Sequence, residues 1–275
     1  MRLKTYSVIG LLIIVISEIL MFLGIQPVAT WFTPLAWYGY ILFIDGIVFR
    51  LKGSSLIMTR RKEFLWMLPL SVIFWLIFEY YNLLLRGWHY INLPGILWIR
   101  YVGYVVAFST IMPGLFETAE FLLYLKKIRN FQLKRITVTR RFLYISMVVG
   151  TSLMAFPIIY PSPYLWAFVW CGFVFLLEPI NYLRGVPSLY RDLEQGIGKN
   201  ALAYFAAAYV CGILWEFWNY WAYTKWIYTF PPIIKNIKIF EMPILGFLGF
   251  GPFGLEYYVM YNFVKGLTRK NEKIY

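Results

Sequence analysis

The chain has 275 residues, of which 61% are hydrophobic, 21% aromatic and 14% charged, and its formal net charge is +13. Soluble domains contain about 45–50% apolar and about 25% charged residues, so this composition excludes an ordinary soluble domain. The single histidine, His89, excludes sites that need several imidazoles, such as bis-histidine haem and histidine-rich di-iron clusters.

Eight apolar stretches are long enough to cross a membrane, since a hydrocarbon core of about 30 Å needs about 20 apolar residues per helix. The first stretch follows two basic residues but is interrupted by Glu18, so we expect an uncleaved helix rather than a signal peptide. The expected fold class is therefore an all-α integral membrane protein with eight transmembrane helices. The predicted spans are residues 6–25, 31–50, 64–85, 97–125, 142–160, 164–184, 201–222 and 240–264.

Lysine and arginine are distributed unevenly between the two sides of these spans. The side that carries both termini and the loops 50–63, 126–141 and 184–199 holds 21 of the 26 basic residues, and the opposite side holds 5. By the positive-inside rule both termini are cytoplasmic, in a multi-pass protein of the inner (plasma) membrane. The net charge then reflects topology and attraction to anionic headgroups, and we expect no nucleic-acid partner.

The sequence contains an internal similarity that spans three successive helices. Residues 31–56 align with residues 164–189 at an offset of 133, and later segments continue at offsets of 137 and 139. Acidic residues stay in register throughout, which favours a duplication into two four-helix repeats, 1–130 and 131–275. Since each repeat has an even number of spans, the repeats should be related by a pseudo-twofold axis along the membrane normal, with a central cleft between them. The matched pairs include Trp37 with Trp170, Asp45 with Glu178, Glu79 with Glu216, Asn82 with Asn219, and Glu117 with Glu256.

Apart from Glu241, which opens the last span near the outer face, eight of the thirteen acidic residues lie within the predicted spans. A charged side chain at mid-bilayer costs at least about 2.5–3.5 kcal/mol, so these residues must face the protein interior. They either link helices by hydrogen bonds or form a functional site. We favour a site, because a hydrogen bond within a membrane contributes only about 0.6 kcal/mol. The eight residues are Glu18, Asp45, Glu79, Glu117, Glu120, Glu178, Glu216 and Glu256.

These carboxyls should form two layers at different depths. Counting along the spans places one layer toward the cytoplasmic side, near the midline between the repeats, and the other nearer the outer side. The cytoplasmic layer is Asp45, Glu117, Glu178 and Glu256, and the outer layer is Glu79 and Glu216. The candidate catalytic residues are Glu216, Glu79, Glu256 and Glu117. The candidate ligand-binding residues are Asn82, Asn219, Asp45, Glu178, Trp215, Trp218, Trp226 and Trp88.

The outer layer has the features of an acid site. Asn82 follows Glu79 by three residues and Asn219 follows Glu216 by three, so each amide shares a helix face with the carboxyl and can hold it. Aromatic residues are dense around Glu216, and aromatic faces stabilise either a carbocation made by protonating an alkene or an organic cation. Trp88 and Trp226 belong either to this site or, with Tyr228, to the interfacial aromatic belt. No nucleotide-binding or zinc-protease motif occurs in the sequence, so we expect neither a metal nor a cofactor.

Two prolines, Pro113 and Pro252, each precede a glutamate by four residues and should kink their helices. The segments LWEFWN, KWIY and FEMPILGFLGF, with their counterparts in the first repeat, resemble a group of uncharacterised bacterial polytopic membrane proteins over most of residues 164–264. A more distant resemblance is to the lycopene-cyclase-domain proteins of carotenoid synthesis, which are small duplicated helical bundles relying on acidic residues. That resemblance implies an isoprenoid substrate but transfers no catalytic residue, because the paired glutamates after proline are not reproduced here.

Three functions remain open on the sequence. The first is a membrane-embedded enzyme or binder for an isoprenoid or another lipid, with Glu216 or Glu79 as general acid. The second is a proton- or cation-coupled transporter that uses the carboxyl layers as a relay. The third is a non-catalytic membrane subunit. Membrane lipids or a hydrophobic small molecule are the expected partners, and the sequence does not indicate an oligomeric state.

Overall fold

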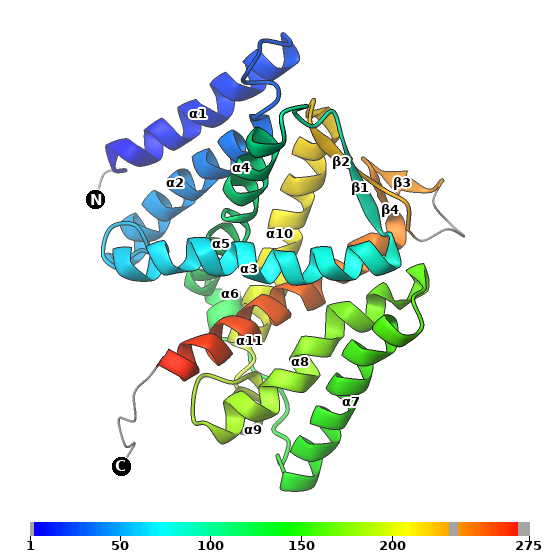
Figure 1. The fold of residues 1–275 in the computed structure, drawn as a ribbon. Helices are drawn as coiled ribbons and strands as arrows, with labels where there is room; N and C mark the ends of the chain where they lie inside the picture. Colours follow the sequence, from blue (N-terminus) through cyan, green and yellow to red (C-terminus); the bar gives the residue numbers. More distant parts are fainter. Residues whose placement is uncertain (1–2, 231–235, 269–275) are drawn as a thin grey trace.

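The computed structural model describes residues 3–230 and 236–268. These residues are mainly helical, and four short strands form two small two-stranded sheets (Figure 1). The first half contains α1 (Thr5–Phe22), α2 (Phe32–Lys52), α3 (Arg61–Leu85), β1 (Trp88–Ile91), α4 (Leu97–Phe108), α5 (Ile111–Tyr124) and α6 (Lys126–Arg129). The basic residues Arg2, Lys235, Arg269, Lys270 and Lys273, which entered the predicted charge distribution, lie outside the described residues.

The second half contains the long helices α7, α8, α10 and α11 together with several short elements. Two of these, η1 and η3, are 3₁₀ helices, and three are strands. The elements are α7 (Arg140–Ile159), η1 (Pro163–Leu165), α8 (Trp166–Leu183), α9 (Leu189–Gln195), α10 (Lys199–Trp221), β2 (Lys225–Tyr228), β3 (Lys238–Ile239), β4 (Met242–Pro243), η3 (Ile244–Gly249) and α11 (Phe250–Thr268).

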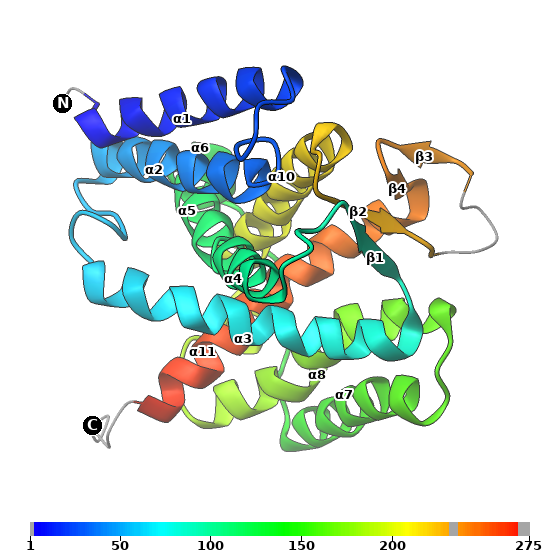
Figure 2. The ribbon, with the colours of Figure 1, turned by 45° about the horizontal axis from the view of Figure 1, so that its top comes forward.

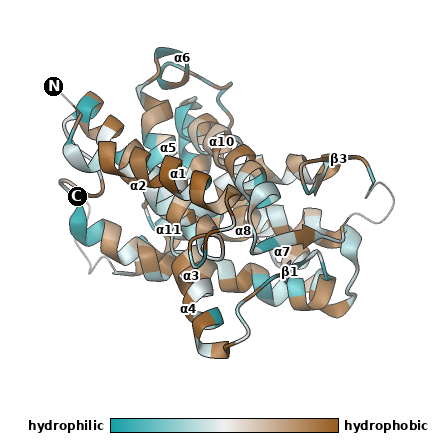
Figure 3. Cartoon of the chain, turned by 90° about the horizontal axis from the view of Figure 1, so that it is seen from above, coloured by the Kyte–Doolittle hydropathy of each residue, from teal (hydrophilic) through white to brown (hydrophobic). Residues whose placement is uncertain are grey.

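Seven of the described helical segments are long and apolar enough to cross a membrane, which makes this a multi-pass membrane protein. Apolar residues cover most of the length of these helices, and α1 is among the most uniformly apolar (Figure 3). The seven segments are Thr5–Phe22, Phe32–Lys52, Arg61–Leu85, Leu97–Tyr124, Arg140–Ile159, Pro163–Leu183 and Lys199–Trp221.

The predicted eighth span, residues 240–264, differs from the structure. Its first ten residues include β4 and η3, and the helix that follows, α11, extends to Thr268. Glycine, tyrosine and asparagine lower the hydropathy of α11, so it is not among the seven segments. Most of its residues are nevertheless buried, because α11 packs against α8 and α10 in the centre of the bundle.

The predicted fourth span is broken into α4 and α5 at Ser109 and Thr110. Pro113 explains the break, because proline has no N–H and its ring collides with the carbonyl group four residues earlier, that of Ser109. The Ser109 and Thr110 hydroxyls donate to nearby backbone carbonyls at 2.7 and 2.6 Å. Pro252 stands at the matching place in the second half, where η3 is followed by α11. The breaks therefore lie where the sequence predicts kinks.

The peripheral helices pair as α1 with α2 and α7 with α8, while α5, α10 and α11 form much of the interior. Strand β1 pairs antiparallel with β2, so segments from the two halves of the chain lie side by side. Trp88 is opposite Tyr228, and Tyr90 is opposite Trp226. The N-terminal end of α1 and the C-terminal end of α11 lie on one side of the molecule, and the strands lie on the opposite side (Figures 1 and 2).

The close packing of α10 and α11 depends on Gly254. A Cβ atom at this position would lie 2.2 Å from the backbone carbonyl oxygen of Tyr204. We expect Gly254→Ala to lower the free energy of unfolding by about 1–3 kcal/mol, because the helices must separate. The measurement is the midpoint of thermal unfolding in detergent, with Gly103→Ala as the control, since the nearest atom to a Cβ there is 4.0 Å away. Equal midpoints for both variants would contradict the close contact.

Candidate functional site

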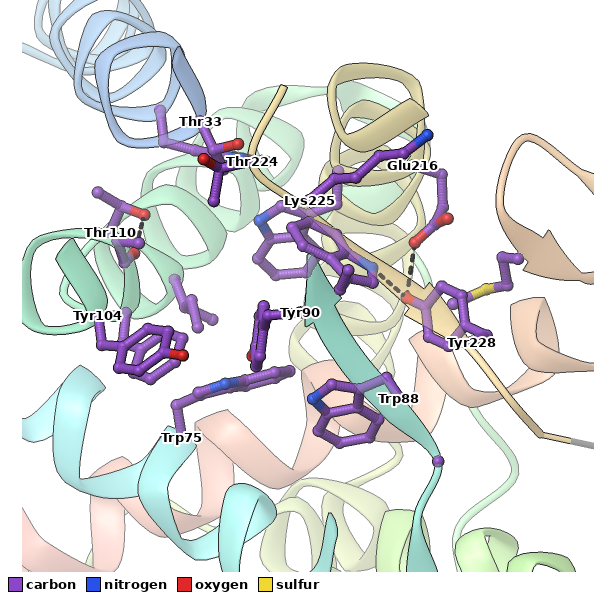
Figure 4. Close-up of a pocket in the computed structure, with 18 of the residues that line it drawn as sticks. Thr33, Trp75, Trp88, Tyr90, Tyr104, Thr110, Glu216, Thr224, Lys225 and Tyr228 are labelled. Atoms are coloured by element: carbon purple, nitrogen blue, oxygen red, sulfur yellow. Dashed lines mark hydrogen bonds between the residues drawn. The ribbon is translucent and has the colours of Figure 1, made fainter. Parts of the chain in front are cut away.

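A large cavity lined mainly by aromatic side chains lies beside the β1–β2 pair; we call it the aromatic cavity (Figure 4). Its cavity volume is about 200 Å³, and the whole space between its walls, together with its open mouth, is about 1520 Å³. Its walls come from both halves of the chain. Eight of the twelve tryptophans line it: Trp31, Trp37, Trp75, Trp88, Trp166, Trp170, Trp215 and Trp226.

Glu216 on α10 is a fully buried carboxyl in the wall of this cavity. Its Oε1 accepts a hydrogen bond from the Tyr228 hydroxyl at 2.7 Å, and that hydroxyl accepts one from Trp226 Nε1 at 2.9 Å (Figure 4). Burial and the neighbouring Glu216 carboxyl raise the pKa of Tyr228 well above its usual range, so the hydroxyl remains a donor. The other oxygen, Oε2, has no hydrogen-bond partner among the described residues. Glu216 thus has one oxygen held and one oxygen available.

Glu79, the counterpart of Glu216 on α3, is in a different state. Its Oε1 accepts from Trp75 Nε1 at 2.9 Å, from Trp88 Nε1 at 3.0 Å and from the Tyr90 hydroxyl at 2.5 Å. Its Oε2 accepts from Asn82 Nδ2 at 3.3 Å. Four donors therefore occupy both oxygens, and Glu79 is not among the residues that line the cavity. This carboxyl is a structural anchor for the first strand and its aromatic residues.

One sequence difference accounts for much of this asymmetry. The residue one helical turn before Glu79 is Trp75, which donates to it, whereas the residue one turn before Glu216 is Gly212. Glycine has no side chain that could donate. The space beside it is filled by Phe250, whose ring would lie 2.5 Å from a Cβ atom at position 212. The sequence shows this difference once Trp75 is known to be a donor to Glu79.

Both asparagines hydrogen-bond to the backbone of the strand that follows, but only Asn82 also hydrogen-bonds to its carboxyl. Asn82 contacts Glu79 as predicted, and its Oδ1 also accepts from the backbone N–H of Trp88 at 3.0 Å. Asn219 makes no hydrogen bond to Glu216 in the described structure, contrary to prediction. Its amide exchanges two hydrogen bonds of 2.9 Å with the backbone of Trp226. Each asparagine therefore fixes the strand that follows its helix.

The predicted cytoplasmic layer is buried but divided into separate clusters. Asp45 and Glu117 do meet, on the turn at 55–57. Asp45 accepts from Ile57 N at 2.8 Å, Ser55 Oγ at 2.9 Å and the Tyr6 hydroxyl at 2.6 Å, and Glu117 Oε1 accepts from Leu56 N at 2.9 Å. These contacts are all local to the first half.

In the second half, Glu178 accepts from Ser188 Oγ at 2.6 Å and Tyr190 N at 3.1 Å, and Glu256 accepts from Phe173 N at 3.1 Å. Within the described residues no hydrogen bond joins the Asp45–Glu117 cluster to Glu178 or Glu256. The hydrogen bonds therefore do not support the prediction that all four carboxyls meet at the midline. Each carboxyl instead accepts hydrogen bonds from a nearby turn or helix. None of the four lines the aromatic cavity.

The predicted tryptophans are placed in two groups. Trp88, Trp215 and Trp226 line the cavity; Trp88 Nε1 donates to Glu79, and Trp226 Nε1 donates to the Tyr228 hydroxyl. Trp218 does not line it; its Nε1 donates to Glu18 Oε1 at 2.7 Å and ties α10 to α1. This contact gives Glu18, the acid of the first helix, a structural partner.

Sequence reasoning missed the two tyrosines that bind the outer carboxyls. A signal existed, since both strands carry the pattern Trp-x-Tyr, and residues two apart in a strand face the same side. Tyr90 and Tyr228 are the second members of these patterns. Trp75 and Trp166 were also missed as cavity residues, because their roles depend on how distant helices pack.

In the described part of the chain, no group of three or more histidine, cysteine, aspartate or glutamate residues could hold a metal ion. Comparisons with family models, with curated proteins and with solved structures find no match for this chain. Function is therefore inferred from the geometry of the aromatic cavity.

The two outer carboxyls should respond differently to an isosteric amide. Glu79→Gln replaces an acceptor oxygen by an NH₂ group that faces other donors, so we expect a loss of about 1–3 kcal/mol in the free energy of unfolding. Glu216→Gln keeps the oxygen that accepts from Tyr228 and should change stability by less than about 0.5 kcal/mol. Thermal unfolding of both variants in detergent measures this difference, and a larger loss in Glu216→Gln would contradict the assigned roles.

Proposed function

We propose that this protein is a membrane-embedded enzyme or binder for a hydrophobic small molecule, an isoprenoid or another lipid, which occupies the aromatic cavity. The observation that supports this most directly is the carboxyl of Glu216, which is buried in the cavity wall with one oxygen held by Tyr228 and the other without a partner among the described residues. A carboxylate with a single neutral donor is poorly compensated in a buried site. We therefore propose that Glu216 carries a proton on Oε2.

A protonated Glu216 beside aromatic faces suits acid chemistry on an alkene. Its proton adds to one alkene carbon, the π electrons form the new C–H bond, and the neighbouring carbon becomes a cation. Aromatic rings such as that of Trp215 stabilise this cation while Glu216 is a carboxylate. Loss of a proton from an adjacent carbon to Glu216 restores the acid, so isomerisation or cyclisation needs no other reactant.

A proton- or cation-coupled transporter is the second candidate. It is supported by Glu117, Glu178 and Glu256, each of which is buried and has one oxygen without a hydrogen-bond partner in the described ranges. Such groups could pass protons between the two halves. The aromatic cavity favours the first candidate, because its charged lining residues are limited to Arg100, Glu216 and Lys225 among those described.

We also propose the finer architecture predicted from the sequence, namely eight crossings in two repeats, 1–130 and 131–275, with η3 and α11 as the eighth. Matching contacts support it: Asp45 with Ser55 corresponds to Glu178 with Ser188. The β1–β2 register also supports it. Exchanging the two halves turns the Trp88–Tyr228 pair into the Tyr90–Trp226 pair.

The acid role is tested by Glu216→Gln, which keeps the shape and the Tyr228 hydrogen bond but removes the transferable proton. We expect it to abolish the change that the wild-type gene makes in the lipid profile of a complemented deletion strain, at equal protein abundance in the membrane. Glu256→Gln is the matched control, since it is a buried glutamate with one unpartnered oxygen in the described structure but lies outside the cavity lining. An unchanged profile in Glu216→Gln would remove the acid hypothesis, and equal losses in Glu216→Gln and Glu79→Gln would favour the transporter.

The proposed orientation places both termini in the cytoplasm of a cell whose inner membrane holds the protein. We expect a cysteine introduced at Lys134, in the basic connection before α7, to be protected from a membrane-impermeant maleimide in intact spheroplasts. A cysteine at Asn92, next to β1, should be labelled. Both substitutions are made with Cys171 and Cys211 replaced by serine, and lysed cells are the control for reactivity. The reverse labelling pattern would overturn the orientation.

A further inference from the structure

The aromatic cavity contains polar atoms that the protein itself leaves without partners. Thr33 Oγ1, Trp37 Nε1 and Trp166 Nε1 are buried atoms of lining residues, and within residues 3–230 and 236–268 none has a hydrogen-bond partner. Trp37 and Trp166 are each only 1% exposed, so neither side chain reaches the surface to meet solvent.

Other tryptophans of the aromatic cavity do have hydrogen-bond partners for their indole N–H groups. Trp75 and Trp88 donate their N–H groups to Glu79, and Trp226 donates to the Tyr228 hydroxyl. The fold therefore satisfies these indoles internally, while Trp37 and Trp166 are more deeply buried and have no partner among the described residues. Trp37 is firmly held by ring contacts with Trp215 and Trp218, at 5.1 Å between centroids in each case.

Thr33 and Trp37 form a local pair on α2. They are four residues apart on one helix, so they share a face, and both line the cavity. Figure 4 shows Thr33 on a different wall from Glu216, which comes from α10. A ligand that reaches Glu216 with its apolar part can place another group against α2.

The chemistry of the two side chains defines that group. An indole N–H can only donate a hydrogen bond, and a threonine hydroxyl can donate or accept. A pure hydrocarbon would leave the buried indole N–H unpaired, which is unfavourable. An oxygen atom on the ligand would accept from Trp37 and exchange a hydrogen bond with Thr33.

We propose that the ligand is an oxygenated apolar molecule, such as an isoprenoid alcohol, ketone or quinone, whose oxygen binds to Thr33 and Trp37 on α2. This inference rests on the proposed binding role of the aromatic cavity and names the substrate class that the proposed function leaves open. It selects against hydrocarbon isoprenoids, including the hydrocarbon substrates that a cyclase-like role would suggest.

A matched pair of probes tests this directly. Farnesol and farnesene share a fifteen-carbon polyene framework, and only farnesol carries a hydroxyl group. Binding to the native state raises the midpoint of thermal unfolding by mass action, so titrating each probe against the purified full-length protein in detergent gives its apparent affinity. We expect farnesol to bind about tenfold or more tightly than farnesene, the difference that one buried hydrogen bond supplies.

Two substitutions locate the oxygen site. Trp37→Phe keeps an aromatic ring but removes the N–H, and Thr33→Val keeps the shape but removes the hydroxyl, so both should reduce the preference for farnesol toward equality. Trp98→Phe is the control, because Trp98 is exposed and lies outside the cavity lining. It should retain the preference.

The outcomes separate this inference from the proposed function. Equal binding of both probes to the wild-type protein, or an unchanged preference in both Trp37→Phe and Thr33→Val, would overturn the oxygen site while leaving a lipid-binding cavity. Binding of neither probe would overturn the oxygen site together with the binding role of the cavity. The lipid profile of Glu216→Gln tests the acid role by itself.

Discussion

The pairing of β1 with β2 is the interaction on which the site depends. Asn82 holds Trp88, the first residue of β1, to the end of α3, and Asn219 holds Trp226, the second residue of β2, to the end of α10. The strands then bring Tyr90 to Glu79 and Tyr228 to Glu216. Without this short ribbon, Glu216 would lose its Tyr228 donor, and Glu79 would keep only the donors on its own helix, Trp75 and Asn82. In an apolar environment, where unpaired polar groups are unfavourable, such donors decide which carboxyl is a fixed anchor and which is available.

Much of the fold follows from hydropathy, and residues 240–264 show where that signal becomes weak. Hydropathy reports contact with lipid, whereas α11 is surrounded mostly by other helices and can carry glycine and tyrosine. The broken fourth span was predictable, because Pro113 acts through local geometry that any sequence shows. The long basic connections and the apolar spans are likewise local properties.

The candidate site was predictable only in outline. The pattern of acids and aromatics singled out Glu79 and Glu216, but the sequence favoured Glu216 because of its neighbouring rings. The structure gives a different physical reason, since Trp75 saturates Glu79 and the corresponding Gly212 cannot saturate Glu216. The division of the predicted cytoplasmic layer into separate clusters was not predictable, because it depends on turns that fold back onto individual helices.

Under the proposed duplication, the register of β1 and β2 has an evolutionary consequence. Exchanging the two halves leaves the β1–β2 pairing unchanged. Two identical chains form a strand pair of this kind across a twofold interface. An ancestor of half this length would then have assembled as a homodimer, with two equivalent carboxyls at the shared ribbon. After fusion of the two copies into one chain, the two glutamates and their surroundings no longer had to be identical. One glutamate could remain the anchor of the ribbon while the other lost a donor and faced the space between the former subunits.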